Sequence, residues 1–553
     1  MSREIFRKYT DAETFSRIVD YDSVAEMWQA SARSYADSVA IVDGEEYTYA
    51  ALDALVASKR GELAARGIAP GTLVAILAPN SVGFVTAFLA AATRGTPSIL
   101  MPAHLPCEAV FGIAAGFGIG AILYDVALED KLSLVKERLP GVALIPTAPT
   151  DTPVADATPL PGSALCTVLF TGGTTGKSKA AKLSGRAVMA GVRNGCFGIK
   201  KIFGERYLLV LPLTHVFGLI RNLLTSLYTG SALFICKNNK DMFRDIATFR
   251  PTIMVMVPAL AEMALGLSKT LGRNMLGESM KTVICGAAAV APYLVAEYAK
   301  LGIALFPGYG LTESANLVSG NPESLRKPES VGIIYPDMEY RVVDGELWLK
   351  GLNMMDGYVG EEENAAAYSD GWFRTGDLVR IDDEGFLYIT GRIKEIIVLP
   401  SGENVSPAEL EVKFYALDTV QDCLVYEDEG GTLALQILPR AAMLASLGIT
   451  DAEAHFKAEV AKINETLAPC ERINKIIISR EVEHLPCGTE VQRDRRQIRR
   501  RVCRQGQGEC EVGAPITPRR LRKRMDNESR GHQSQILWGS SVERDRLATH
   551  TPT

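Results

Sequence analysis

The chain has 553 residues, of which 47% are hydrophobic and 22% are charged, and its formal net charge is −6. A length well above the roughly 100–200 residues of one domain predicts at least two domains with substantial apolar cores. The negative net charge gives no reason to expect a nucleic-acid partner.

The N-terminal residues carry charges throughout and lack the apolar stretch of a secretory signal. The best candidate for a membrane span, 109–124, is shorter than the roughly 20 apolar residues that a span needs, and it contains four glycines. It is more typical of a helix, a turn and a strand in a globular core. The ten cysteines include no CxxC pair. We therefore expect a cytoplasmic protein with reduced thiols and no transmembrane segment.

From about residue 23 to residue 400, apolar runs of strand length alternate with stretches of helical periodicity. Such alternation predicts α/β layers with buried, mainly parallel sheets. The clearest predicted strands are 73–78, 208–211, 253–257 and 282–285, and the clearest predicted helices are 49–66, 82–93 and 293–301.

Two changes along the chain predict domain boundaries. After Gly391 a turn-rich segment, 400–407, leads into a smaller α+β region. From residue 487 onwards, 15 lysines and arginines stand against 8 acidic residues, and apolar residues become scarce. We predict an N-terminal domain over 1–391, a small mobile domain over 392–486, and an Arg-rich, disordered tail over 487–553. The tail is either native or the product of a shifted reading frame.

A glycine- and threonine-rich loop follows the predicted strand 164–170. Its glycines let the backbone turn closely around an anion, its amide groups and hydroxyls are donors, and its lysines add positive charge. These features predict a polyphosphate site. A Walker A loop would need glycine at position 171, where this chain has threonine. The loop consists of Thr171, Gly172, Gly173, Thr174, Thr175, Gly176, Lys177, Ser178 and Lys179.

Six further segments follow this loop in a fixed order, and together the seven resemble the adenylate-forming (AMP-binding) superfamily, which includes acyl- and aryl-CoA synthetases. The resemblance covers about 23–486. It implies a large N-terminal domain of α/β sheets with a small β-barrel-like part, followed by a small α+β C-terminal domain. The segments are FTGGTTGKSK (170–179), LPLTHVFG (211–218), VPAL (257–260), YGLTES (309–314), GWFRTGDL (371–378), GRIKEII (391–397) and SGENVSPAELE (401–411).

The resemblance also implies the chemistry. ATP activates a carboxylic acid to an acyl-adenylate with release of pyrophosphate, and coenzyme A then takes the acyl group as a thioester. Glu313 would hold Mg²⁺, a hard cation that prefers carboxylate oxygens, and Thr312 and Lys179 would contact phosphate. Taken alone, the Thr312-Glu313 pair is more typical of a helix cap. Asp377 would accept hydrogen bonds from the ribose hydroxyls, although a turn aspartate is the alternative for Asp377.

Further roles are implied by the same resemblance. His215 would lie beside the substrate carboxylate, although a lone histidine in an apolar stretch is more often a core residue. Two residues would act in the change from adenylation to thiolation: Lys394 at a hinge, and Gly402 beside the pantetheine arm of coenzyme A. The other implied contacts are Arg392 with the nucleotide, Gly286, Ala287 and Ala288 beside adenine, Tyr309 and Gly310 between adenine and substrate, and Phe217, Gly218 and Leu219 at the acyl pocket.

The C-terminus departs from the family pattern. The family's small domain ends with a lysine, in a stretch resembling P-x-T-x-x-G-K, that stabilises the adenylation transition state. Here HLPCGTEVQ follows Glu483, and the only later lysine is Lys523. We therefore expect adenylation by this chain to be impaired, whereas thioester formation depends less on that lysine.

Several functions remain open at this point. The apolar residues after His215 favour a fatty acid as substrate, with an aryl acid as the next candidate. An acyl-AMP ligase that loads a phosphopantetheine carrier protein shares the first step. A nucleotide-binding protein with impaired catalysis is a further alternative, motivated by the missing lysine.

Overall fold

The computed structural model describes residues 3–479, except 151, 153, 172–178, 401 and 429. These residues belong to one compact unit, which spans Met1–Val502. In this part of the chain, no helix combines the length and the apolar character that crossing a membrane would require.

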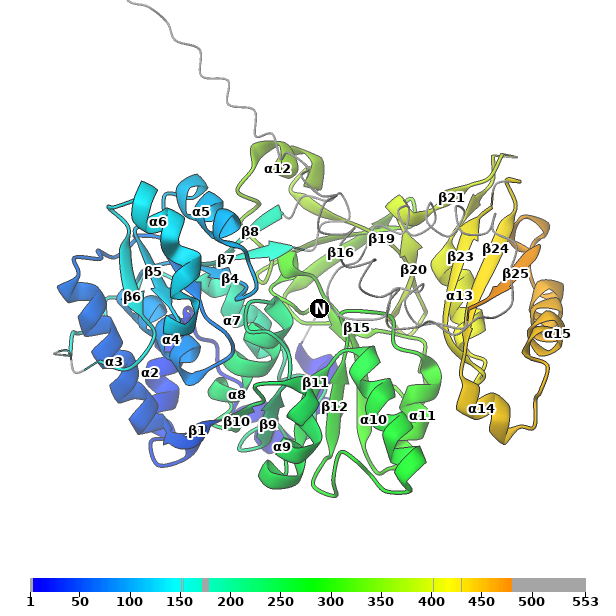
Figure 1. Cartoon of the computed structure of the whole chain (residues 1–553), viewed down its shortest axis with the longest axis horizontal. Coiled ribbons are helices and arrows are strands. Elements are labelled where there is room, and N and C mark those ends of the chain that lie inside the picture. Colours follow the sequence, from blue (N-terminus) through cyan, green and yellow to red (C-terminus); the bar gives the residue numbers. More distant parts are fainter. Residues whose placement is uncertain are drawn as a thin grey trace, which may run out of the picture. The chain divides into compact units, whose positions relative to one another are not determined.

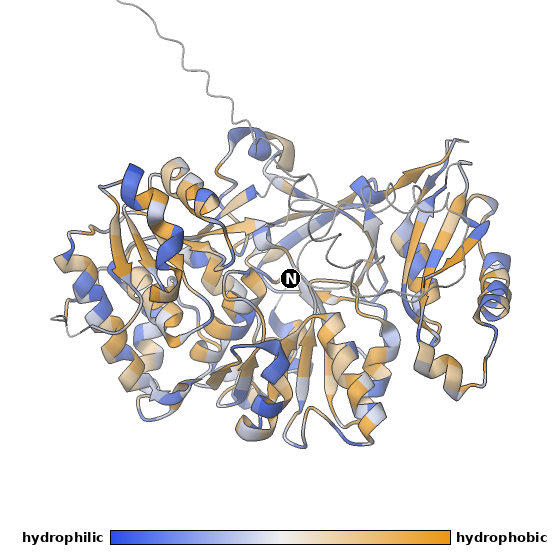
Figure 2. Cartoon of the chain, in the orientation of Figure 1, coloured by the Kyte–Doolittle hydropathy of each residue, from blue (hydrophilic) through white to orange (hydrophobic). Residues whose placement is uncertain are grey.

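The first half of the chain forms a six-stranded sheet with the order β6-β5-β3-β4-β7-β8. Its strands are parallel except β8, which runs antiparallel to β7. Every residue of β3, β4 and β5 is buried, as expected for parallel strands covered on both faces, and Figure 2 shows these strands as hydrophobic. The strands are β3 (Val74–Leu77), β4 (Ser98–Met101), β5 (Ala121–Tyr124), β6 (Ala143–Pro146), β7 (Leu165–Thr171) and β8 (Lys179–Ser184).

Capping residues mark the ends of several helices in this part of the chain. The Ser81 side chain accepts a hydrogen bond from the Phe84 amide at the start of α4, and Gly95 ends that helix in the left-handed conformation. Ser23, Thr48 and Ser184 cap α2, α3 and α7 in the same way. The helices are η1 (Arg3–Lys8), α1 (Ala12–Ser16), α2 (Val24–Ser34), α3 (Tyr49–Ala65), α4 (Val82–Arg94), α5 (Cys107–Gly116), η2 (Val126–Leu132), α6 (Ser133–Arg138) and α7 (Gly185–Asn194).

A second, 14-stranded sheet has a parallel half in the order β13-β12-β11-β9-β10-β1, with β2 antiparallel at its edge (Figure 1). Its strands are β1 (Val39–Asp43), β2 (Glu45–Thr48), β9 (Arg206–Leu209), β10 (Ala232–Ile235), β11 (Ile253–Met256), β12 (Thr282–Cys285) and β13 (Ala304–Tyr309). The intervening helices are the π-helix η3 (Phe217–Leu224), α8 (Thr225–Tyr228), η4 (Asn239–Asp241), α9 (Met242–Phe249), α10 (Pro258–Leu271) and α11 (Pro292–Lys300).

The same sheet continues beyond β13 as antiparallel strands with a smaller core of their own around Val318, Leu347 and Leu387. The small β-barrel-like part that the family resemblance implies was not assigned to particular residues, and it stays a prediction. The elements that follow β13 are η5 (Thr312–Ser314), β14 (Ser319–Gly320), β15 (Gly332–Ile334), β16 (Met338–Val343), β17 (Glu346–Gly351), α12 (Glu361–Ala367), β18 (Tyr368–Ser369), β19 (Trp372–Ile381) and β20 (Phe386–Arg392).

The last described region has a separate apolar core whose buried residues all lie between Ile397 and Ile473. A three-stranded sheet, β23-β24-β25, forms its centre, and β21 and β22 form a hairpin before it. The elements are η6 (Ile393–Glu395), β21 (Ile397–Val398), β22 (Asn404–Val405), α13 (Pro407–Tyr415), β23 (Val420–Glu427), β24 (Leu433–Pro439), α14 (Ala441–Ser446), α15 (Ala452–Glu465), η7 (Pro469–Glu471) and β25 (Lys475–Ile478).

The predicted strands and helices are therefore present, with ends that differ by at most two residues. The predicted fold class is a large α/β region followed by a small α+β region. The two large sheets with their helices form the first region, and the three-stranded sheet with its separate core forms the second. The boundaries at 391 and 486 stay predictions, and the tail 487–553 lies outside the described residues.

A buried ion pair lies within α3, and hydrogen bonds from its lysine join this helix to the end of β6. The Lys59 ammonium, 1% exposed, donates to Glu62 at 2.7 Å and to the carbonyls of Pro146 and Ala148. We expect Glu62→Leu to lower the free energy of unfolding by about 3–5 kcal/mol, because the ammonium would lose its counter-charge inside the protein.

Thermal unfolding followed by circular dichroism checks this prediction. Glu137→Leu, at an exposed position of α6, is the matched control and should leave the melting temperature nearly unchanged. Equal melting temperatures for both variants would contradict a structural role for the pair.

Candidate active site

Asp377 lies at the centre of a buried polar contact between β13, β19 and β20. One carboxylate oxygen accepts a hydrogen bond from the Tyr309 hydroxyl at 2.5 Å, and the other accepts one from Arg392 Nε at 2.7 Å. The Asp377 amide donates to the Thr375 hydroxyl at 3.0 Å. Asp377 and Arg392 face each other across the β19–β20 ladder, so the sheet register fixes the ion pair.

Burial raises the pKa of the Asp377 carboxyl above its ordinary value, although the Arg392 charge and the Tyr309 hydrogen bond oppose this change. Burial and the neighbouring carboxylate raise the pKa of Tyr309 far above its ordinary value. Tyr309 therefore keeps its proton and acts as the donor. Each carboxylate oxygen still has a lone pair for a further donor, such as a ribose hydroxyl.

Glu313 forms a second polar contact with Tyr358. The Tyr358 hydroxyl donates to Glu313 Oε1 at 2.5 Å, and the Lys179 ammonium lies 4.6 Å from the centre of the Tyr358 ring. Burial and the Glu313 charge raise the pKa of Tyr358, which keeps this hydroxyl protonated. A tyrosine thus connects the last residue of the predicted phosphate loop to the predicted metal ligand.

Backbone hydrogen bonds position the two residues of the Glu313–Tyr358 contact. The amides of Lys182 and Val359 donate to the carbonyls of Gly357 and Ala180, so the segment 356–359 runs antiparallel beside β8. On the other side, the Met355 amide donates to the Glu313 carbonyl at 2.7 Å. Across the β7–β8 ladder, Thr171 pairs with Lys179, which places the two ends of the predicted phosphate loop opposite each other.

The segment Tyr309–Glu313 joins the two contacts. Its first residue contacts Asp377, and its last residue contacts Tyr358 beside Lys179. Four residue steps span at most about 14 Å, a distance that one nucleoside triphosphate can bridge. The structure therefore places Asp377 against one end of this segment, and Tyr358 with Lys179 against the other end.

The turn after this segment is tight and strained. A Cβ atom at Gly310 would lie 1.4 Å from the Asn316 carbonyl oxygen, so only glycine is tolerated there. Ala315 and Asn316 both have left-handed backbones, with φ of 46° and 82°, a conformation that costs non-glycine residues free energy and is concentrated at functional sites.

The short helix η5 decides between the two interpretations of the Thr312-Glu313 pair. The helix N-cap is Leu311, and its amide donates to the Ser314 hydroxyl at 3.0 Å. Ser314 therefore supplies the capping contact, and the Glu313 carboxylate points instead to Tyr358.

The residues predicted to line the acyl pocket lie at the start of the π-helix η3. The Phe217 ring lies beside Gly286, directly after β12, because a Cβ at Gly286 would lie 3.6 Å from Phe217 Cζ. The same Cβ would lie 3.0 Å from the Gly308 carbonyl oxygen in β13. Gly218 is required by the turn before it, since a Cβ there would lie 2.2 Å from the Pro212 carbonyl. Leu219 is fully buried.

His215 is exposed in this turn, and its carbonyl accepts a hydrogen bond from the Leu219 amide at 2.9 Å. The core-histidine alternative is therefore wrong. Ala287 and Ala288 are also exposed, and Ala287 has a left-handed φ of 67°.

The remaining predicted residues lie near the small region or outside the described residues. Lys394 is exposed in η6, and Gly402 forms the turn of the β21–β22 hairpin with a φ of 91°. Among the described residues, no neighbouring atom would contact a Cβ at Gly402. The left-handed backbone conformation by itself therefore favours glycine at this position. Gly172, Gly173, Thr174, Thr175, Gly176, Lys177 and the position of the missing C-terminal lysine lie outside the described residues.

Glu313 has the donor chemistry for a magnesium ion. Its Oε1 accepts from Tyr358, while its second oxygen has no hydrogen-bond donor among the described residues. The described residues contain no cluster of three or more histidine, cysteine or acidic side chains suited to a metal. Magnesium is commonly held by one or two carboxylates together with water and substrate phosphates, so a single glutamate beside a phosphate loop suits a metal that arrives with the nucleotide.

Sequence reasoning missed Tyr358. A lone tyrosine has no spacing pattern, and its role depends on the pairing of 356–359 with β8. The turn-forming Asp356-Gly357 that precedes it was the available signal.

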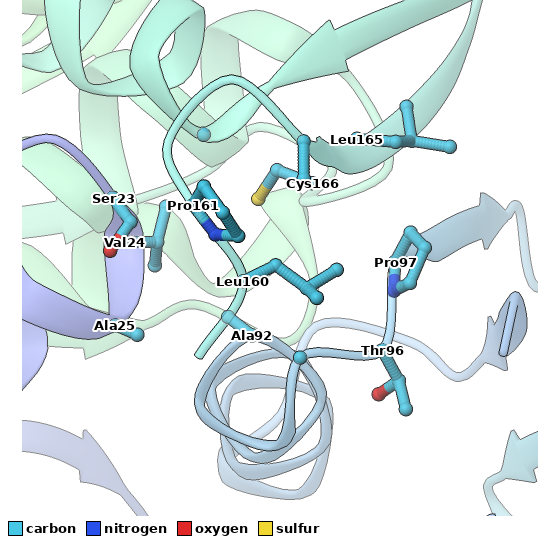
Figure 3. Close-up of a pocket in the computed structure, with 13 residues that line it drawn as sticks. Ser23, Val24, Ala25, Ala92, Thr96, Pro97, Leu160, Pro161, Leu165 and Cys166 are labelled. Atoms are coloured by element: carbon cyan, nitrogen blue, oxygen red, sulfur yellow. The ribbon is translucent and has the colours of Figure 1, made fainter. Parts of the chain in front are cut away.

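A small apolar pocket lies away from these residues. Val24, Leu160, Pro161 and Cys166 contribute to its wall, and its volume is about 30 Å³ (Figure 3). None of the predicted site residues lines it, and its size suits a water molecule rather than a substrate.

Comparison with known proteins identifies the family. Residues 28–359 match the family described as AMP-binding enzyme. Among curated relatives, the 4-coumarate--CoA ligase 5 of Oryza sativa subsp. japonica is 30% identical and covers 83% of this chain and 91% of its own length. The peroxisomal OPC-8:0-CoA ligase 1 of Arabidopsis thaliana is 28% identical and covers 84% and 91%.

Solved structures share the fold. The anthranilate CoA ligase AuaEII in complex with anthranoyl-AMP has a TM-score of 0.77 at 19% identity, and covers 88% of this chain and 98% of its own. The ATP-bound MatB of Rhodopseudomonas palustris has a TM-score of 0.75 at 23% identity, and covers 87% and 99%. The chain has the adenylate-forming enzyme fold. It belongs to the AMP-binding enzyme family.

We expect Asp377→Asn to weaken ATP binding by about 10- to 100-fold, because an amide cannot accept charge-assisted hydrogen bonds at both of its terminal atoms. Isothermal titration calorimetry measures the change. Asp383→Asn, at an exposed position of the β19–β20 turn, is the matched control. If both variants bound ATP with equal affinity, Asp377 would not be part of the nucleotide site.

The raised pKa of Asp377 predicts the pH dependence of nucleotide binding. The ionised carboxylate is the acceptor, so affinity should be complete above the pKa and fall as the carboxyl gains its proton. Because burial raises that pKa, the loss on acidification should begin at a higher pH than for an ordinary aspartate near 4. Titrations with adenosine, which has no phosphate to ionise, should show this loss in the wild type and not in Asp377→Asn.

Proposed function

We propose that the chain is an AMP-forming acid–CoA ligase. The observation that carries this proposal is the segment Tyr309–Glu313, which connects the Asp377 contact to the Glu313–Tyr358–Lys179 contact. A nucleotide whose ribose binds Asp377 would extend its phosphates towards Lys179 and Glu313.

In the first step, a carboxylate oxygen of the acid attacks the α-phosphorus of ATP. A new P–O bond forms, the bond to the β-phosphate oxygen breaks, and pyrophosphate leaves with the bonding electrons. The reactants are both anions, so the enzyme must lower their repulsion and align them. Lys179 supplies positive charge, Thr312 supplies a hydroxyl donor, and the Asp377–Arg392 contact fixes the ribose.

Glu313 would hold a magnesium ion that neutralises phosphate charge when the nucleotide is bound. Tyr358 orients the Glu313 side chain through its hydrogen bond, which leaves the second carboxylate oxygen for the metal.

In the second step, the sulfur of coenzyme A attacks the acyl carbonyl carbon. The C–S bond forms, the C–O bond to AMP breaks, and the thiol proton is released. Lys394 and Gly402 are the proposed hinge and pantetheine contacts. Coenzyme A is favoured over a carrier protein as acceptor, because the two curated relatives above are named as CoA ligases.

The acid is proposed to have an apolar body next to its reacting carboxylate. Phe217 over Gly286 and the buried Leu219 supply an apolar surface there. A fatty acid is the first candidate and an aryl acid the second, and the relatives include both a 4-coumarate and an OPC-8:0 ligase. We propose the cytoplasm as the location.

The proposed reaction predicts equal amounts of thioester, AMP and pyrophosphate from ATP, coenzyme A and an accepted acid. Chromatography of these products over a panel of fatty and aryl acids checks it. The same panel is run on a variant whose C-terminus is replaced by one with the family lysine. Failure of both proteins to make AMP from any acid would overturn the proposal, whereas activity of the restored form alone would assign the impairment to the C-terminus.

We expect Glu313→Gln to abolish the strengthening of ATP binding by Mg²⁺ and to lower the adenylation rate by at least about 100-fold, because a neutral amide is a poor ligand for this cation. ATP affinity without metal should be retained. Calorimetry with and without Mg²⁺ measures the first effect. Glu329→Gln, an exposed control, should leave both properties intact.

A further inference from the structure

The solvent-exposed side of α10 is almost without charge. Of the seven exposed residues in this helix, only Lys269 is charged, and Figure 2 shows most of the helix as hydrophobic. Met263, Leu267 and Leu271 are 36–53% exposed. Because they recur every four residues, they lie along one side of the helix. Single exposed apolar residues are common, whereas a continuous line of them is typical of an interaction surface.

A pocket of about 220 Å³ lies at the C-terminal end of the same helix, where α10 meets the end of α11. Three basic side chains and one acidic side chain line it, so these side chains carry a formal charge of +2. They are Lys269, Arg273, Lys300 and Glu297. The Lys269 and Lys300 side chains are 45% and 72% exposed, so an anion in solution can reach them.

The ion pairs of the pocket leave part of its positive charge unused. Glu297 accepts hydrogen bonds from the ammonium groups of Lys269 and Lys300, at 2.6 and 2.5 Å. These bonds lower the pKa of the Glu297 carboxyl, which therefore stays ionised and offsets one of the two lysine charges. The Arg273 guanidinium forms no ion pair with any described residue. One lysine charge and the Arg273 charge thus remain for an anionic partner.

The combination of charge and apolar surface indicates which partner fits. Basic side chains near a helix C-terminus also stabilise the helix dipole, which accounts for the lysines but not for the apolar side next to them. A second copy of this chain, docked symmetrically on this surface, would bring two positive pockets together. An anionic membrane surface instead offers apolar depth beside negative headgroups, and helices with one apolar side and flanking basic residues bind such surfaces.

We propose that α10 binds the surface of a membrane that contains anionic phospholipids. Met263, Leu267 and Leu271, which span about 12 Å of helix, enter the boundary between headgroups and acyl chains. The pocket at the end of the helix binds a lipid phosphate. None of the residues of the proposed active site lies on this surface, so the inference does not depend on the proposed ligase function.

Sedimentation of the full chain with lipid vesicles tests the proposal. Vesicles of phosphatidylcholine are compared with vesicles that also contain about 30% phosphatidylglycerol, an anionic lipid. We expect at least about tenfold tighter binding to the anionic vesicles, because each basic residue near such a surface contributes to affinity. Equal binding to the two kinds of vesicle, or binding to neither, would overturn the proposal.

Two pairs of variants locate the binding surface. Leu267→Glu should weaken binding to anionic vesicles at least about fivefold, because it places a carboxylate in the apolar side of α10. Leu325→Glu, at an exposed leucine between β14 and β15, is its control. Arg273→Ser should weaken the same binding about fivefold, whereas Arg66→Ser, at the exposed end of α3, should leave it unchanged. All four positions are exposed, so melting temperatures should stay close to that of the wild type.

The Arg-rich C-terminal segment is present in every variant, so a difference between the members of a pair reports on α10 and its pocket. If Leu267→Glu bound anionic vesicles as tightly as Leu325→Glu, the proposal would fail and the C-terminal segment would be the better candidate. Analytical ultracentrifugation provides the second decision. A dimer that Leu267→Glu dissociates, without any vesicle binding by the wild type, would assign the surface to a second copy of the chain instead.

Discussion

The buried carboxylate of Asp377, held between the Arg392 guanidinium and the Tyr309 hydroxyl, is the contact on which the proposed nucleotide site depends. Each partner comes from a different strand, so the carboxylate is oriented only when β13, β19 and β20 are correctly aligned. Arg392 is also the last residue of β20, directly before the chain enters η6. The proposed nucleotide contact and the start of the small region therefore share one residue.

The sequence predicted the parallel strands well because their positions follow from burial alone. Strands β3, β11 and β12 are buried along their whole length, and a continuous apolar run identifies such strands. Within the segment YGLTES, Tyr309 contacts Asp377 and Glu313 contacts Tyr358, and the site roles of these residues stay predictions. Their partners could not be predicted in the same way. Tyr358 reaches Glu313 through a backbone pairing with β8, which leaves no local pattern in the sequence.

Arg221 shows the same limit more clearly. In the sequence it interrupts an apolar helix, and such an arginine is normally paired or exposed. Only the structure shows that Arg221 is buried, that its Nη1 has no hydrogen-bond partner among the described residues, and that Asp20 and Asp337 form their ion pairs with Arg193 instead. Apolar patterning predicts where a helix packs, whereas the balance of charges inside the protein depends on contacts between distant segments.

The separate core of the small region has a mechanical consequence. Every buried residue of that core lies between Ile397 and Ile473, so no apolar side chain in it is shared with the large sheets. A change in orientation about the residues that follow Gly391 would leave each core intact. Its free-energy cost would be set by polar surface contacts, such as the hydrogen bond from the Ser406 hydroxyl to the Thr390 carbonyl, which water can replace at little loss.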